Sequence, residues 1–295
     1  MAELRAPGLT ADSLNGWLAA VGATVLVQGC RLAWSDSPRP VAVLTTSGDD
    51  DLPTCLSAAI PSLSALEGLA IANRAAFPRT VSIAHFAEAA RRARATVDDG
   101  SLALSVTDLV PDDQADKLPH SRFDVGAPHG ETLWTRLRAC RALLPESPED
   151  LAAAIRATLQ GWAVRQDTNG LGFDVRRLEA GDPPLGGKFV DPLAEILAFY
   201  GLYLFPVRGD GHRVTTRGWA EQPVRGRRYP ATRFLWPAWS ASLDRWGIDA
   251  LLGRFFADAA PRSRRAFGIV GVYEAVVYQK TGDMDQTAGF GSRRV

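Results

Sequence analysis

The chain has 295 residues, of which 46% are hydrophobic and 22% charged, and its formal net charge is zero. A chain of this length and composition can bury a large core, which excludes a disordered protein. Its apolar stretches are all shorter than the roughly 18 residues of a membrane helix, so we expect no membrane segment. We also expect a cytoplasmic location, because the cysteines Cys30, Cys55 and Cys140 are odd in number and no signal peptide precedes them.

The two halves of the chain differ in charge. Residues 1–161 hold 14 basic and 19 acidic groups, whereas residues 162–295 hold 19 basic and 14 acidic groups. The formal charges are therefore −5 and +5. This asymmetry indicates either an anionic partner for the second half or contact between the two halves.

The N-terminal part predicts a helix followed by strands. Residues Thr10–Ala23 have an apolar face at helical period, with Thr10 or Asp12 as the capping residue and Gly22 as the end. Three short β-rich pieces then predict strands. They are Val25–Val27, Arg31–Trp34 and Val41–Leu44.

The middle of the chain predicts helices separated by one long loop. The expected helices are Ser62–Asn73, Ile83–Val97, Thr132–Leu144 and a segment from Pro148 to Trp162 that Ser147 caps. We expect the last two to form a hairpin. Residues Ser101–Val110 alternate like a strand. Val110–His129 form a polar loop that we expect to be poorly ordered in the free protein or ordered by a partner.

The strongest helix signal lies at Asp191, which is followed by Pro192. An aspartate can cap the first turn, and proline loses no hydrogen bond at the first helical position. An apolar face at helical period follows, made of Leu193, Ile196, Leu197 and Tyr200. Gly201 is the predicted end, and the residues from Leu202 to Thr216 predict a hairpin.

The C-terminal part predicts strands, one helix and a loose tail. The expected elements are a strand at Phe173–Leu178, a helix at Ser240–Phe256 whose inward residues are Leu243, Trp246, Leu251 and Phe255 or Phe256, a strand at Ile269–Tyr278 and a polar tail from Lys280. We therefore expect an α+β fold, with strand-bearing ends that share one sheet or core around a helix-rich middle. The prediction is one domain, residues 1–295, with a subdivision into 1–164 and 165–295 as the alternative.

The common catalytic motifs are missing from the sequence. The stretch nearest to a phosphate-binding loop, Asp182–Phe189, lacks the first glycine and the hydroxyl residue. No histidine pair has metal-ligand spacing among His85, His120, His129 and His212. The acidic residues Asp49, Asp50, Asp51, Asp283 and Asp285 suit either Mg²⁺ ligands or solvated loops. We expect no enzyme activity, cofactor or metal; an enzyme with a site assembled from distant residues is the alternative.

The stretch from Arg208 to Arg233 carries the clearest chemical signal. Its seven arginines against Asp210 and Glu221 give it a charge of about +5. Arginine suits phosphate, and flanking aromatic rings can stack on bases. The predicted nucleic-acid-binding residues are Arg208, Arg213, Arg217, Arg225, Arg227, Arg228 and Arg233.

Two other interpretations of this stretch remain open. The arginines can contact a protein partner or the acidic half, while the aromatic residues Trp219, Phe234, Trp236 and Trp239 fill the core. His212 suits a phosphate contact or an exposed turn.

Several stretches recur in an order that resembles a known family. They are SLNGWLAAVGA, RLAWSDSPRPVAVL, GFDVRRLE, DPLAEILAFYGLYLFPV, VTTRGW and RFLWPAWSASLD. This order resembles small proteins of type I-G (formerly I-U) CRISPR systems, notably the extension family of the helicase-nuclease, and more loosely their large-subunit-like proteins. Residues Asp49–Val164 lie outside the resemblance.

The resemblance implies a non-catalytic subunit or accessory of a type I CRISPR interference complex, which serves antiviral defence in bacteria. The implied partners are effector subunits or the helicase-nuclease, and guide RNA or target DNA. It assigns no functional residues. The family tends to carry a basic C-terminal strand, and Tyr273–Gly291 is similar but has only one cation in Tyr278-Gln279-Lys280. A protein-only adaptor in another bacterial pathway is the alternative.

Overall fold

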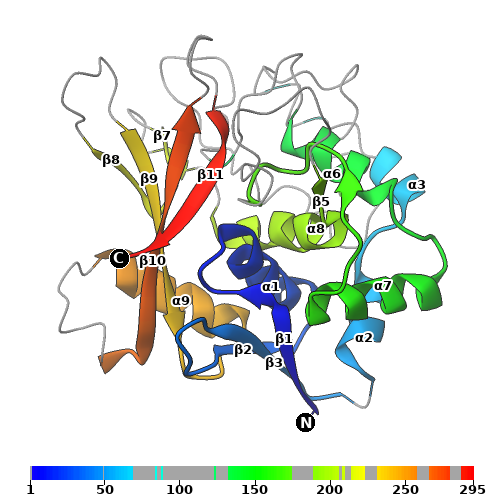
Figure 1. Ribbon diagram of the computed structural model, residues 1–295, viewed down its shortest axis with the longest axis horizontal. Coiled ribbons are helices and arrows are strands. Elements are labelled where there is room, and N and C mark those ends of the chain that lie inside the picture. The colour runs from blue at the N-terminus through cyan, green and yellow to red at the C-terminus, as the bar shows by residue number, and fades with distance from the viewer. Residues whose placement is uncertain are drawn as a thin grey trace.

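A computed structural model describes residues 2–48, 50–68, 84, 88, 123, 132–174, 189–205, 208–209, 214–222, 231–257, 266–279 and 287–295. In this part of the chain, helices fill the centre and one side of the molecule, and the two larger antiparallel sheets lie below and on the other side (Figure 1). This arrangement confirms the predicted α+β class. Among these residues, no helix combines the length and apolarity that crossing a membrane requires.

The N-terminal sheet contains one strand that the sequence did not predict. Its strand order is β1-β3-β2, and its members are β1 (Ala2–Thr10), β2 (Arg31–Trp34) and β3 (Val41–Thr46). The predicted strands β2 and β3 are confirmed. Strand β1 contains Pro7 and Gly8, a pair that is typical of turns, and its register against β3 shifts between Ala6 and Thr10. Pairing with β3 therefore stabilises a strand that its own sequence hardly signals.

Helix α1 (Leu14–Leu26) starts and ends later than predicted. Ser13 is the capping residue, rather than Thr10 or Asp12. The helix continues to Leu26, so the predicted strand at Val25–Val27 is wrong.

Gly22 does not end α1 because it lies at the crossing with helix α8 (Pro192–Gly201). A Cβ atom at Gly22 would come within 1.8 Å of the Leu197 carbonyl oxygen, and one at Gly201 within 2.3 Å of the Leu18 carbonyl oxygen. Both glycines therefore allow the two backbones to touch. Gly201 is the last residue of α8, as predicted. Its backbone dihedrals are those of a right-handed helix, so glycine is needed here for the close contact with α1 and not for a left-handed turn.

Helix α8 begins as predicted. The Asp191 carboxylate accepts hydrogen bonds from the backbone amides of Leu193 and Ala194, at 3.0 and 3.3 Å. The predicted apolar face is buried, and so is every other residue of the helix. Glu195 is 0% exposed, and its carboxylate accepts a 2.5 Å hydrogen bond from the Leu171 amide. Helix α8 is thus the central element of the core (Figure 1).

A short helix and a small hairpin follow α8. The apolar run after Gly201 forms the 3₁₀ helix η3 (Leu202–Leu204). Strands β6 (Arg208–Gly209) and β7 (Val214–Thr215) then pair antiparallel. A strand pair is therefore present as predicted, but its first strand is β6 and not the apolar run that begins at Leu202. Upstream, β4 (Gln166–Asp167) pairs with β5 (Phe189–Val190).

The remaining helices of the middle part begin at capping residues. They are α2 (Leu52–Ala59), α3 (Leu63–Glu67), α6 (Leu133–Arg141) and α7 (Pro148–Gln160), and their caps are Asp51, Ser62, Thr132 and Ser147. The predicted start sites of α3, α6 and α7 are confirmed. The predicted α6–α7 hairpin is wrong, because α7 packs mainly against α2 and β1 while α6 packs against α8.

The C-terminal sheet is larger than predicted. Its strand order is β11-β10-β9-β8, and its members are β8 (Trp219–Gln222), β9 (Ala231–Trp239), β10 (Ile269–Gln279) and β11 (Thr287–Arg294). Only β10 was predicted. The arginine-rich sequence after Trp219 predicts a loop, but β8 and β9 occupy most of it. Strand β11 lies within the predicted loose tail and forms an edge of the sheet, where it pairs with β10. Its polar sequence suits an edge strand, because one side of such a strand has no neighbouring strand.

Helix α9 (Arg245–Ala257) begins five residues later than predicted. Its buried face consists of Ile248, Leu251, Leu252 and Phe255. Trp246 lies off this face with 62% of its surface exposed, so its predicted inward position is wrong. Leu243 lies before the helix and bridges to Leu32 of β2.

Three buried tryptophans connect the two ends of the chain. The indole of Trp17 donates a hydrogen bond to the Pro237 carbonyl at 2.8 Å. Trp236 and Trp239 donate to the carbonyls of Ala11 and Leu32, at 2.8 and 3.0 Å. The ends therefore share one hydrophobic core, as expected, while their strands form separate sheets.

Several predictions lie outside the described residues. They are the helix Ile83–Val97 apart from Ala84 and Glu88, the strand Ser101–Val110, residues 69–73, residues 175–178 and the tail residues 280–286. In the predicted loop Val110–His129, only Phe123 is described. Its ring is buried against Phe173, Phe205 and Phe234, with ring centroids 4.9 to 6.0 Å away. Phe123 therefore anchors the predicted loop to the core.

Candidate functional site

Two of the seven predicted nucleic-acid-binding arginines have described side chains. These are Arg217, just before β8, and Arg233 in β9. Arg208 lies in β6, of which only the backbone is described. The other four predicted arginines lie outside the described residues; these are Arg213, Arg225, Arg227 and Arg228. His212 also lies outside them.

Arg217 contacts both a carboxylate and an aromatic ring. Its guanidinium forms a 2.6 Å ion pair with Asp249 of α9 and lies 5.2 Å from the centre of the Phe205 ring. Three-quarters of the side chain is buried. Arg217 therefore fastens the start of β8 to α9.

Arg233 is paired within the C-terminal sheet. Its guanidinium lies 3.3 Å from the carboxylate of Glu274 on β10, which also forms an ion pair with Arg293 of β11. Glu274 is only 4% exposed, so two arginines balance a buried negative charge. The carboxylates that pair with Arg217 and Arg233 both belong to the basic half, whereas pairing with the acidic half is one of the alternatives that the sequence leaves open.

The aromatic residues among the arginines mostly fill the core. Phe234, Trp236 and Trp239 are 0% exposed, and Trp219 is half-buried. Three of these rings are therefore unavailable for stacking on bases. The core interpretation of these residues is confirmed.

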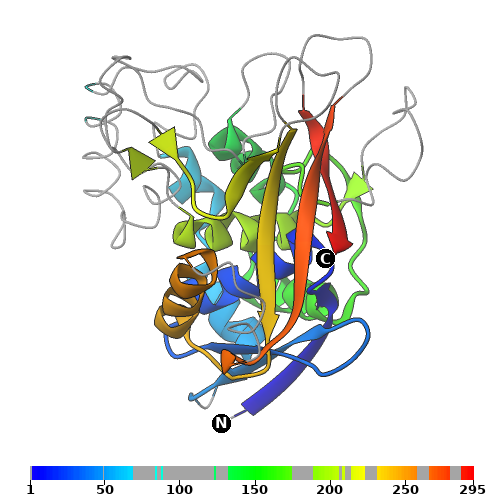
Figure 2. The same ribbon diagram turned by 90° about the vertical axis from the view of Figure 1, so that its left-hand side faces the viewer.

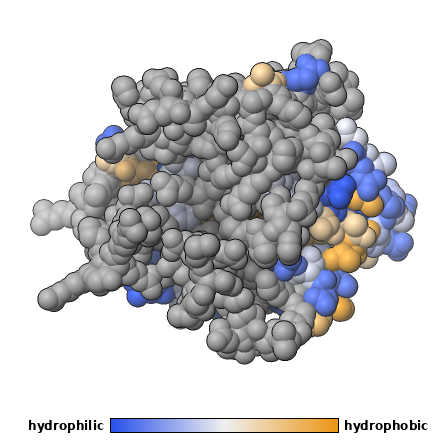
Figure 3. Space-filling model, turned by 90° about the horizontal axis from the view of Figure 1, so that it is seen from above, coloured by the Kyte–Doolittle hydropathy of each residue, from blue (hydrophilic) through white to orange (hydrophobic). Residues whose placement is uncertain are grey.

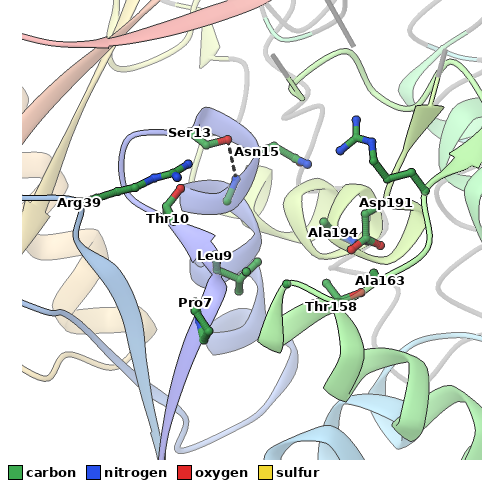
Figure 4. Close-up of a pocket in the computed structure, with 14 residues that line it drawn as sticks. Pro7, Leu9, Thr10, Ser13, Asn15, Arg39, Thr158, Ala163, Asp191 and Ala194 are labelled. Carbon is green, nitrogen blue, oxygen red and sulfur yellow. Dashed lines mark hydrogen bonds between the residues drawn. The ribbon is translucent and has the colours of Figure 1, made fainter. Parts of the chain in front are cut away.

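A polar pocket of about 510 Å³ lies between the first strand and three helices. It is lined by Pro7, Gly8, Leu9, Thr10, Ser13, Asn15, Gly16, Arg39, Thr158, Gly161, Ala163, Arg165, Asp191 and Ala194. Most of these residues come from β1, the start of α1, the end of α7 and the start of α8 (Figure 4). Arg39 lies in the connection between β2 and β3, and Ala163 and Arg165 lie between α7 and β4. Pockets of this size accommodate small molecules.

Glycines bring the walls of this pocket together. A Cβ atom at Gly8 would lie 2.0 Å from the Thr158 carbonyl oxygen of α7. A Cβ atom at Gly16 would lie 2.8 Å from both the amide and the carbonyl of Thr10. Strand β1 therefore contacts both helices through backbone, which leaves their termini facing the pocket.

Charged groups of both signs line the pocket. Arg39 pairs with Asp12 at 3.0 Å, and Arg165 pairs with the buried Asp174 at 2.8 Å. Asp191, which caps α8, supplies a carboxylate that is 8% exposed. Figure 4 shows Arg39 beside Thr10 and Ser13, and Asp191 on the opposite side near Thr158.

Asn15 reaches into this space from the first turn of α1 (Figure 4). It is 2% exposed, and its side-chain oxygen has no hydrogen-bond partner in the part of the chain that the structure describes. Sequence reasoning missed this residue, because one asparagine beside Leu14 in an apolar helix gives no motif. Its signal is its burial, which only the fold determines.

The described cysteines are unsuited to nucleophilic chemistry. Burial raises the pKa of Cys30 to about 12, and burial together with the charge of Glu195 raises the pKa of Cys140. Both thiols therefore stay protonated near neutral pH. The pKa of Cys55 is also raised, by desolvation and by nearby aspartates.

Of the consecutive aspartates Asp49, Asp50 and Asp51, the last has a structural role. Asp51 caps α2 through the Thr54 amide and forms a 2.6 Å ion pair with Arg156 of α7. Hydrogen bonds from Thr54, and then the contact with Arg156, lower its pKa. Among the residues that the structure describes, no cluster of three or more histidine, cysteine or acidic side chains could hold a metal ion.

No protein-family model and no curated protein sequence matches the chain.

Proposed function

We propose that the protein is a non-catalytic subunit or accessory of a type I CRISPR interference complex and acts in the bacterial cytoplasm. The observation that carries this proposal is that three of the stretches resembling the type I-G extension family contact one another in the core. SLNGWLAAVGA forms most of α1, which packs against α8 within DPLAEILAFYGLYLFPV. Trp17, Trp236 and Trp239 join the first of these stretches to RFLWPAWSASLD. Residues that pack against one another restrict which side chains each position accepts. The presence of several such stretches in the family's order therefore supports the resemblance more strongly than any one stretch does.

Contact with nucleic acid is assigned to the arginines between β8 and β9. Arg217 and Arg233 already neutralise carboxylates of the same chain. Arg225, Arg227 and Arg228 lie in the connection 223–230, which contains no acidic residue. We therefore assign phosphate contact to these three, with Arg208 and Arg213 as neighbours in sequence.

Exposed apolar side chains support contact with a neighbouring subunit. Trp162 and Val164 are 77% and 78% exposed, and Phe189 in β5 is 52% exposed. All three lie in or just before the segments that meet in the β4–β5 pair. Figure 3 shows apolar residues among hydrophilic ones on the side where α3, α6 and α7 lie. Large exposed apolar side chains are typical of protein interaction sites.

Assembly can be tested by co-expressing the tagged chain with the proteins encoded beside it. We expect it to co-purify with a helicase-nuclease or another effector subunit, and we expect Trp162→Ser with Val164→Ser to weaken that association. The control is Trp246→Ser, at an exposed apolar residue of α9, which lies on another side of the molecule (Figure 1). Failure to associate with any neighbour, together with hydrolysis of a nucleotide or nucleic acid by the purified chain, would favour the enzyme alternative. A stable complex with proteins of another pathway would favour the adaptor.

Nucleic-acid contact can be tested by replacing Arg225, Arg227 and Arg228 together with glutamine. Affinity for guide RNA and for duplex DNA should fall similarly for all sequences, and the slope of log affinity against log salt should decrease by about 2 to 3. The melting temperature should change little, since arginines that contact phosphate instead of carboxylates of the same chain add little to stability. The control is Arg217→Gln, which should lower the melting temperature instead. Unchanged binding with a lower melting temperature for the triple variant would rule out this assignment.

A further inference from the structure

The pocket between β1, α1, α7 and α8 plays no part in the proposed function, yet it contains an unusual group. The Asn15 side chain is 2% exposed and reaches into the pocket (Figure 4). Its amide oxygen has no hydrogen-bond partner among the described residues. An unsatisfied buried acceptor lowers the stability of the fold unless a bound group donates a hydrogen bond to it.

A backbone donor of the same residue is also unsatisfied. In the first turn of α1, the backbone N–H of Leu14 donates to Ser292 Oγ at 3.1 Å, and that of Gly16 donates to Ser13 Oγ at 3.4 Å. The backbone N–H of Asn15 lies between these two and has no acceptor in the part of the chain that the structure describes. One lining residue therefore offers the pocket both a donor and an acceptor.

The charged residues of the lining are each compensated within the chain. Arg39 pairs with Asp12 at 3.0 Å. Arg165 pairs with Asp174 at 2.8 Å. The Asp191 carboxylate accepts hydrogen bonds from two backbone N–H groups at the N-terminus of α8, which is the positive end of that helix dipole. Each of these lining residues has an opposite charge or dipole beside it, so the ligand class follows from the hydrogen bonds that remain unmade.

The two unsatisfied groups of Asn15 favour a hydroxyl group over an ion. An ionised carboxylate or phosphate accepts hydrogen bonds but cannot donate, so it would satisfy the backbone N–H and repel the amide oxygen. An ammonium group would satisfy the oxygen but would face the positive end of the α1 dipole. A hydroxyl group both donates and accepts. A neutral ligand with hydroxyl groups on adjacent carbons therefore satisfies both groups of Asn15.

Other lining residues suit the same class of ligand. Thr10, Ser13 and Thr158 contribute side-chain hydroxyl groups, which can each donate to or accept from a further hydroxyl of the ligand. Pro7 and Ala163 contribute apolar surface, which suits the C–H groups of a sugar ring. The cavity of about 510 Å³ accommodates a ring of this size.

We propose that this pocket binds a small neutral polyhydroxylated molecule of the monosaccharide class. One hydroxyl group of the ligand donates to the Asn15 amide oxygen, and the adjacent hydroxyl accepts from the Asn15 backbone N–H. The site is independent of the proposed CRISPR function.

Binding can be measured on the full chain by calorimetry and thermal shift. The probes are D-glucose, D-galactose and D-mannose. Each is compared with its uronate, which carries a carboxylate, and with its 2-amino derivative, which carries an ammonium group. We expect at least one neutral sugar to bind saturably and to raise the melting temperature by about 5 °C at roughly a hundredfold excess over Kd. Both charged analogues of that sugar should bind at least about tenfold more weakly.

Two variants test the assignment to Asn15. Asn15→Leu removes the amide oxygen, so it should weaken binding about tenfold or more while the melting temperature of the free protein stays unchanged or rises. Sugars at high concentration also stabilise proteins because they are excluded from the protein surface. An increase in melting temperature therefore supports the site only if Asn15→Leu lacks most of it. The matched control is Thr46→Val, which should bind like the unchanged chain, because the Thr46 hydroxyl is also buried without a partner among the described residues but lies outside the pocket lining.

Three results would overturn the proposal. They are the absence of saturable binding by all three neutral sugars, equal or tighter binding of a charged analogue, and full affinity in Asn15→Leu. If Asn15→Leu fails to fold, Asn15→Asp decides the assignment. It keeps an acceptor in the first turn of α1, where a negative charge suits the helix dipole, and it should bind the 2-amino sugar about threefold or more tightly than the unchanged chain does. Unchanged affinity for the amino sugar would then exclude a ligand at Asn15.

Discussion

Helices α1 and α9 have the same length and similar residue types, but they occupy opposite environments. Each has 13 residues, including tryptophan and glycine. In α1, Trp17 is 0% exposed and Gly22 touches the backbone of α8. In α9, which flanks the C-terminal sheet (Figure 2), Trp246 is 62% exposed and a Cβ atom at Gly253 would meet nothing within 4 Å. The role of a glycine or tryptophan is therefore set by what packs against it.

The physical reason is the number of faces that each helix buries. Helix α1 lies between α8, both larger sheets and the aromatic core, so nearly every residue is buried. Helix α9 buries one face, and on its solvent side the Arg245 guanidinium lies 4.5 Å from the Trp246 ring centre. Such an exposed cation–π contact contributes about 0.5–1 kcal/mol. A sequence pattern cannot distinguish the two environments when both helices are rich in apolar residues.

The largest expected effect is that of Gly22→Ala. The new methyl group would overlap the Leu197 carbonyl, so α1 and α8 must move apart. We expect the free energy of unfolding to fall by about 3 kcal/mol or more, as measured by urea denaturation. A loss below about 1 kcal/mol would show that the helices separate easily.

Trp17→Phe should have the next largest effect. It removes the indole donor and leaves the Pro237 carbonyl without its buried hydrogen bond. The expected loss is about 2 kcal/mol. Trp34→Phe is the control, because the Trp34 indole is buried without a hydrogen-bond partner among the described residues and should cost about 1 kcal/mol less. Equal losses for both variants would assign the effect to ring volume alone.

Gly253→Ala should change stability in the opposite direction. Gly253 is an exposed position inside α9 with open space around it. Alanine favours the helix by about 0.5–1 kcal/mol relative to glycine. Thermal unfolding should therefore show a small increase in Tm. A decrease in Tm would mean that another group packs on this face of α9. Gly253 would then not differ from Gly22 in its surroundings.

The smallest effect is expected for Trp246→Gln. The ring is mostly exposed, so its removal should change the free energy of unfolding by about 0.5 kcal/mol or less. Chemical denaturation beside the Trp17→Phe variant would measure the difference between the two tryptophans directly. A loss above 1 kcal/mol would indicate that α9 depends on this side chain for packing.

The candidate sites were predictable to different degrees. Composition identified the arginine-rich stretch, but it could not show that Arg217 and Arg233 pair with Asp249 and Glu274, since both partners are more than 30 residues away. The pocket was not predictable. Its lining combines four distant segments, and its central residue, Asn15, belongs to no motif.

Some elements are predictable because their signals are local in the chain. The starts of α7 and α8 follow from Ser147-Pro148 and Asp191-Pro192, because capping and the proline dihedral act within one turn. Strands β2, β3 and β10 likewise follow from their own β-rich residues.

Other features depend on contacts with residues that are distant in the chain, and only the folded structure reveals them. Strands β1 and β11 are stabilised by pairing with β3 and β10, despite Pro7 in one and a glycine-rich polar sequence in the other. The continuation of α1 through Gly22 depends on contact with α8, and the burial of Asn15 depends on β1 closing over the start of α1. In each case the free energy gained from a distant partner exceeds the weak local preference, and that partner cannot be identified from the segment's own residues.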